Sequence, residues 1–148
     1  MDSCQAALGL ALRRDTEAAF ELLLTTIAGS ETSDEALRYL ADAVFLVSRW
    51  TGDFGRGESI LRDLAARTRA PAIRGWITVR MAHLAGPADN SELGNAALGD
   101  FTIVGDDAGQ AMSVLAMAFP QYDLLPSAAF RLQMVDAARE VGERLVDP

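Results

Sequence analysis

Apolar residues recur at intervals of three and four along most of the chain, and short turn segments separate the runs. The clearest run starts after Ser33, where Asp34 and Glu35 follow a capping hydroxyl, and it continues at helical spacing to Trp50. Shorter runs of the same kind precede and follow it. The pattern predicts helices over about residues 3–13, 16–29, 34–50, 56–69, 71–85, 108–119 and 128–145.

Capping and turn residues mark where these helices begin and end. Asp15, and either Asp106 or Asp107, can accept hydrogen bonds from the unpaired amides at a helix start. Pro71 suits the first position of a helix, because its fixed φ and missing N–H cost nothing there. The segment Thr51–Gly55 breaks the longest run. We therefore expect helices that alternate with short turns.

One region of the chain is less regular. Asn90 or Ser91 is suited to cap a helix there, although Gly94 and Gly99 lower the helix propensity. The segment Phe101–Val104 has a strand-like composition, but the chain offers no other segment with which a strand would pair. We expect this segment to be either the end of the helix or an extended connector.

The composition agrees with a helical protein. Half of the 148 residues are hydrophobic and only 7% are aromatic, so the apolar residues are mainly aliphatic, and Ala and Leu favour helices. We predict a single all-α domain over residues 1–148 with about seven helices. No apolar run reaches the roughly 18–20 residues that cross a bilayer. Because Asp2 stands where a signal peptide has positive charge, we expect a cytoplasmic protein outside the membrane.

A turn acid followed by small residues occurs more than once. Asp15 precedes Ala18 and Ala19, and Asp53 precedes Gly57 at a distance of 38 residues from the first acid. A period of about 34 to 40 residues is typical of helical-hairpin repeats.

The segment 36–71 resembles a tetratricopeptide-type repeat. The likeness is carried by Trp50-Thr51-Gly52-Asp53-Phe54, where that family commonly has a Gly-Asp-aromatic turn, by Gly57, Leu61 and Leu64 at packing positions, and by Pro71 at the close. Phe45 and Ser48 depart from the pattern, which prefers a small and an aromatic residue there. The resemblance implies antiparallel helical hairpins that stack and bind peptides or proteins. An irregular helical bundle is the alternative, since such turns also occur in ordinary hairpins.

Charge is distributed unevenly along the chain. All 13 basic residues are Arg, against 21 acidic residues, and the net charge is −8. The absence of Lys reflects either a GC-rich genome or a use for the planar guanidinium. Residues 49–80 carry a net charge of +4, whereas residues 81–130 contain six acids and no Arg. An acidic protein repels a polyanion, so we do not expect a nucleic acid as the partner.

Residues that could perform chemistry are few. The single Cys4 excludes an internal disulfide and a multi-thiolate metal site, and the single His83 excludes paired imidazole ligands. Asp106 and Asp107 lack the alternating pattern of a calcium loop. The segment Gly52–Gly57 lacks the preceding strand and the Lys of a phosphate-binding loop. We expect a protein that is not an enzyme and has no metal and no cofactor.

Residues typical of protein interfaces gather on two of the predicted helices. Trp, Tyr and Arg are enriched at binding hot spots. We predict that a protein or peptide partner with acidic character binds a surface formed by Tyr39, Arg49, Trp50, Arg74, Trp76, Arg80 and His83. The plainer interpretation is that Trp50 packs over Phe54 at a helix end and that Trp76 fills the core.

Two further hypotheses remain open. The protein could instead be a small acidic inhibitor that imitates nucleic acid and occupies a nucleic-acid-binding protein, with acids at Asp89, Glu92, Asp100, Asp106, Asp107 and Asp123. The apolar stripe from Phe130 to Leu145 and the face formed by Met112, Leu115 and Phe119 are wide enough to dock on a second copy, which would make a homodimer.

Overall fold

The computed structural model describes residues 3–29 and 33–118, together with residues 136, 139–140 and 143. The described elements are α1 (Ser3–Leu12), α2 (Thr16–Gly29), α3 (Asp34–Thr51), α4 (Phe54–Ala65), α5 (Pro71–Leu84), α6 (Pro87–Val104) and α7 (Asp107–Ala118). No strand occurs among the described residues. The prediction of an all-α protein with about seven helices is confirmed. The predicted last helix, the stripe from Phe130 to Leu145 and Phe119 fall largely outside the described residues.

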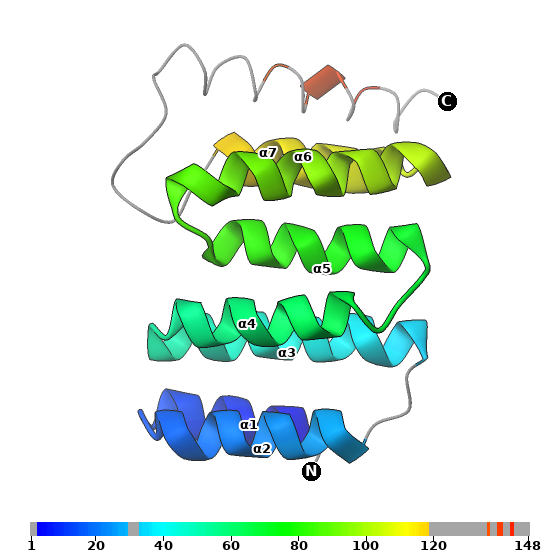
Figure 1. Cartoon of the computed structure of the whole chain (residues 1–148). Coiled ribbons are helices and arrows are strands. Elements are labelled where there is room, and N and C mark those ends of the chain that lie inside the picture. Colours follow the sequence, from blue (N-terminus) through cyan, green and yellow to red (C-terminus); the bar gives the residue numbers. More distant parts are fainter. Residues whose placement is uncertain (1–2, 30–32, 119–135, 137–138, 141–142, 144–148) are drawn as a thin grey trace.

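The described helices form two layers, and consecutive helices pair across the layers as antiparallel hairpins. The odd-numbered helices contact one another in order, α1 with α3, α3 with α5, and α5 with α7. Each even-numbered helix contacts the odd-numbered helices before and after it in the chain. The backbones of the described even-numbered helices stay apart, and Arg56 of α4 reaches α2, where it pairs with Glu17 and lies over the ring of Phe20. Figure 1 shows the resulting row, which runs from α1 and α2 at one end to α6 and α7 at the other.

Local capping explains most of the helix boundaries. The side chains of Asp15, Ser33 and Asp106 accept hydrogen bonds from amides in the first turns of α2, α3 and α7. Pro71 occupies the first turn of α5. All four starts agree with the sequence prediction, and Asp106, not Asp107, is the residue that caps α7.

The turn between α3 and α4 is closed by two residues. Gly52 ends α3 in the left-handed conformation with φ 78°, which costs a residue without a Cβ little. The side chain of Asp53 then caps α4 by accepting from the amide of Arg56 at 3.2 Å. The predicted break in the segment Thr51–Gly55 is thus confirmed.

The prediction for the start of α6 was wrong. The helix begins at Pro87 after Gly86, three residues before the expected cap at Asn90. Asn90 is instead buried, and its amide nitrogen donates to the carbonyls of Ala82 in α5 and Ala116 in α7, both at 2.8 Å. A buried amide needs such partners, so Asn90 ties three helices together. The helix continues to Val104, which confirms the first of the two alternatives for Phe101–Val104.

The core extends through the row as two clusters of buried side chains. The larger cluster joins α1 to α5 and includes Phe20, Leu37 and Leu61, whereas the smaller one surrounds Phe101. Close packing of α3 on α4 depends on Gly57, because a Cβ at that position would lie 1.9 Å from the hydroxyl oxygen of Ser48. The two helices therefore meet nearly backbone to backbone, which fixes how α3 presents its outer face.

Candidate partner-binding surface

Helices α3 and α5 lie against each other. They present polar and aromatic side chains that contact one another on adjoining faces. The side chains recur at intervals of three and four residues, so each set forms one stripe along its helix. We call this surface the α3–α5 face; it consists of Arg38, Asp42, Phe45 and Arg49 from α3 and Trp76, Arg80 and His83 from α5.

Trp76 is the centre of the α3–α5 face. Its indole N–H donates to Oδ1 of Asp42 at 3.2 Å. The guanidinium carbons of Arg38 and Arg80 lie 4.2 Å and 4.5 Å from the centroid of the indole ring, within the range of a cation–π interaction. Trp76 is half-buried, and it packs at the edge of the smaller core cluster. The plainer interpretation placed Trp76 inside the core, whereas in the structure it packs on the core with part of its side chain exposed.

Arg80 is held in place from several sides. Its Nε donates to Oδ1 of Asp42 at 2.7 Å, and its guanidinium also lies 5.0 Å from the ring centroid of Phe45. Only 18% of its side chain is exposed. Because Asp42 balances its charge, Arg80 serves mainly to fix the positions of Trp76 and Phe45.

His83 closes the end of the face near Arg49. Its ring meets that of Phe45 edge-on at 5.9 Å, and its Nδ1 lies 2.8 Å from the carbonyl oxygen of Val79. Because a carbonyl only accepts, Nδ1 carries the proton and Nε2 is left as an acceptor. Burial lowers the pKa of His83, and the positive charges of Arg80 and Arg49 lower it further, although the bond to Val79 opposes this shift. The ring is therefore neutral at pH 7.

Arg38 and Arg49 differ from Arg80 because neither contacts a carboxylate among the residues that the structure describes. Both side chains are exposed, and neither forms an ion pair within the part of the chain that the structure describes. A second stripe of α3 runs beside them and exposes apolar surface at Tyr39 (46%), Leu46 (39%) and Trp50 (60%). Trp50 is thus largely exposed at the end of α3, and the packing over Phe54 that the plainer interpretation expected does not bury it.

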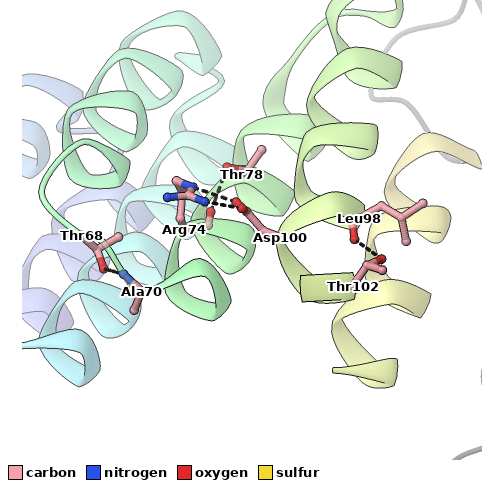
Figure 2. A network of polar contacts seen from close by, with 7 residues as sticks. All are labelled: Thr68, Ala70, Arg74, Thr78, Leu98, Asp100 and Thr102. Atoms are coloured by element: carbon pink, nitrogen blue, oxygen red, sulfur yellow. Dashed lines mark hydrogen bonds and ion pairs between the residues drawn. The ribbon is translucent and has the colours of Figure 1, made fainter. Parts of the chain in front are cut away.

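Arg74 is separated from the other predicted site residues. It lies two residues before Trp76, which places it about 200° around the helix. Figure 2 shows its guanidinium on Asp100 of α6, where Nε donates to Oδ2 at 2.9 Å and the second nitrogen bonds Oδ1. The hydrogen bond to Asp100 raises the pKa of Arg74. The pair ties α5 to α6, and it leaves Arg74 without a part in the α3–α5 face.

Two hollows lie at opposite ends of α3. A small one of about 130 Å³ is mostly apolar and lies between α5 and α7, where Arg38, Ile73, Trp76 and Met112 contribute to its wall. A larger one of about 500 Å³ lies where the α1–α2 turn meets the end of α3, and it is lined by Arg14, Thr16, Arg49, Trp50, Thr51 and Gly52. The α3–α5 face connects the two hollows.

The sequence predicted most residues of this surface, but three of its residues were not predicted. Tyr39, Arg49, Trp50, Trp76, Arg80 and His83 lie on or beside the α3–α5 face, as the prediction expected. Arg38, Asp42 and Phe45 were not singled out. Their spacing with Arg49, at intervals of four, three and four residues, is the signal that places them on one side of α3.

No family model, curated protein or solved structure matches this chain. None of the described helices is both long and apolar enough to cross a membrane. Among the described residues, no three His, Cys, Asp or Glu side chains are grouped as a metal site.

Proposed function

We propose that the protein is a non-catalytic adaptor or regulator that binds an acidic segment of a partner protein on the α3–α5 face. One observation carries the proposal. Arg38 and Arg49 are exposed and lack an ion pair among the described residues, although the chain has 21 acidic residues against 13 Arg. Guanidinium groups left without a carboxylate in an acidic protein favour a partner that supplies one.

The spacing of the two arginines defines what the partner segment should look like. Eleven residues separate Arg38 from Arg49, which corresponds to about 16 Å along α3. An extended chain covers that distance in about five residues. Two acidic residues about five positions apart would therefore meet both arginines. Apolar residues between or beside them would contact Trp76, Phe45 and the exposed stripe of Tyr39, Leu46 and Trp50.

The arrangement of the helices supports the resemblance to tetratricopeptide-type repeats as part of the proposal. Alternating helices that contact in a row, with a Gly-Asp-Phe turn between α3 and α4, are what stacked hairpins of that family require. Such repeats use the exposed face of one layer to bind peptides. A cytoplasmic location and association into a homodimer also belong to this proposal.

The rival hypothesis of an acidic nucleic-acid mimic has less support. Asp100 is paired with Arg74, and only 12% of its side chain is exposed. Asp106 is engaged in capping α7. Asp89 and Glu92 are exposed on α6, so replacing both with Asn and Gln would abolish partner capture if the rival hypothesis held. The same change should leave binding at the α3–α5 face intact.

A pool of random 12-residue peptides, panned on the immobilised protein, tests the proposed function. We expect retained peptides to be enriched in Asp and Glu at positions about five apart, with apolar residues nearby. Arg38→Glu and Arg49→Glu should each weaken binding of a retained peptide about tenfold or more, since a charge-assisted bond becomes a repulsion.

Arg62→Glu is the matched control. Arg62 is exposed on α4, and its one ion pair within the described residues is with Glu58 four residues before it, so the substitution changes the net charge equally without touching the α3–α5 face. Binding that is lost equally in Arg62→Glu, or a retained pool with no acidic enrichment, would contradict the proposal.

A further inference from the structure

The backbone at Arg14 is held in an unusual conformation. Arg14 has φ 64° and is the only residue other than glycine with a positive φ among the described residues. It ends α1: its amide donates to the carbonyl of Ala11 at 2.9 Å, and the amide of Asp15 donates to that of Leu10 at 3.1 Å. Glycine is the usual residue at such a position, because a Cβ is disfavoured there. An arginine at this position points to a use for its side chain.

The side chain of Arg14 lines the larger hollow together with Arg49. The hollow of about 500 Å³ is lined by these two arginines together with Thr16, Thr51, Gly52 and the exposed Trp50. The hydroxyl of Thr51 is bonded to the carbonyl of Val47 in its own helix, so Thr16 is the hydroxyl residue considered below. Its lining includes no carboxylate. Within the described part of the chain neither arginine forms an ion pair, so the two positive charges in the hollow have no negative charge between them.

Two cations in one hollow match an anion that carries two charges. A phosphate monoester has a charge of about −1.5 to −2 at pH 7 and three strong acceptor oxygens. A single carboxylate would balance only one of the two guanidinium groups. Thr16 adds a hydroxyl that is able to donate to a phosphate oxygen.

We propose that the hollow formed by Arg14 and Arg49 binds a phosphate monoester, supplied by a phosphorylated Ser or Thr of the segment that occupies the α3–α5 face. The phosphoresidue as the source rests on the proposed function, because Arg49 belongs both to the hollow and to that face. A segment lying along α3 therefore reaches the hollow with one of its ends, and the phosphate takes the place of the acidic residue that Arg49 would otherwise bind.

Inorganic phosphate alone tests the site without any peptide. The protein has two tryptophans, so its indole N–H groups give two nitrogen–proton NMR signals, which Trp50→Phe assigns. Titration with phosphate at constant ionic strength should shift the Trp50 signal in a saturable way and leave the Trp76 signal in place. The shift should be lost in both Arg14→Gly and Arg14→Gln.

Glycine readily adopts the positive φ found at position 14, so we expect Arg14→Gly to fold, and a lost Trp50 shift would then report lost phosphate binding. Arg13→Gln is the matched control, because Arg13 donates to the carbonyl of Gly9 and does not line the hollow. Arg13→Gln should bind phosphate as the unaltered protein does. The proposal that the hollow binds phosphate would be contradicted if the Trp50 signal did not shift with phosphate, or if it shifted equally in Arg14→Gly.

Two forms of a retained peptide test the source of the phosphate. One form carries phosphoserine at the end that meets Arg49, and the other carries serine at the same position. The phosphorylated form should bind about tenfold more tightly, and Arg14→Gly should remove that difference. Arg38→Glu should weaken both forms. Equal affinities of the two forms overturn the phosphoresidue as the ligand. If phosphate binds through Arg14 but no peptide binds at all, the site stands, whereas the proposed function and the phosphoresidue both fail.

Discussion

Single residues of this protein show how far local sequence signals reach. Asp15, Ser33 and Asp53 act as caps because their partners lie only three residues further along the chain, so the sequence alone is enough to predict the bonds. Asn90 has the same short polar side chain, but its partners lie eight and 26 residues away. No local pattern distinguishes a cap from a buried bridge, so this prediction failed.

His83 makes folding stability depend on pH. Its pKa lies below the ordinary value of 6.5 in the folded protein, mainly because of burial. The unfolded chain therefore binds the proton first, and the free energy of unfolding falls as the pH drops through about 6.5 towards the folded pKa. One titrating group contributes a slope of at most about 1.4 kcal/mol per pH unit.

His83→Gln should remove this contribution. We expect urea unfolding at a series of pH values between 7.5 and 5 to give a shallower loss of stability for the variant than for the unaltered protein. The acidic residues titrate in both proteins, so the difference between the two curves isolates His83. Parallel curves over the whole range would show that the folded protein does not disfavour the charged imidazole.

At the scale of helices, Asp42 connects α3 to α5. It accepts hydrogen bonds from Trp76 and from Arg80, which lie 34 and 38 residues further along the chain. Asp42→Ala would leave the indole N–H and a mostly covered guanidinium without their acceptor. We expect a loss of about 1–3 kcal/mol in the free energy of unfolding, together with weaker peptide binding because Trp76 is no longer held.

Chemical denaturation of two further variants checks the assignment to Asp42. Asp63→Ala is a matched control, since Asp63 is exposed on α4, and it should change stability by no more than about 0.5 kcal/mol. Asp42→Asn keeps an oxygen acceptor and should recover part of the loss. A variant Asp42→Ala as stable as Asp63→Ala would mean that Asp42 does not connect the two helices.

The helices themselves were largely predictable, whereas the contacts between them were not. The apolar spacing that predicts α3 and α4 depends only on the sequence of each helix itself. The stacking of Arg38 on Trp76 depends instead on how α3 and α5 lie side by side. For the same reason Arg74 was grouped with the site residues, although the structure turns it towards Asp100 on α6.

At the scale of the whole molecule, protection should vary along the row. Helices α3 and α5 each pack along four other described helices, whereas α1 packs along α2 and α3, and α2 adds to α1 and α3 a contact with Arg56 of α4. Local opening is easiest where few elements pack. We expect hydrogen exchange followed by mass spectrometry to show faster exchange in peptides from α1 and α2 than in those from α3 and α5. Uniform protection across these four helices would contradict this expectation.

The outer layer of the row has a mechanical consequence. The backbones of the described even-numbered helices stay apart, and Arg56 of α4, which pairs with Glu17 and lies over Phe20, reaches across to α2. Rotation of the α1–α2 hairpin against the next would therefore strain this surface ion pair first, while the odd-numbered helices stay in contact. Bending of this kind changes the distance between Arg14 at one end and the pocket beside α7 at the other. Partner segments of different lengths would then be accommodated by bending between hairpins, with every helical turn intact.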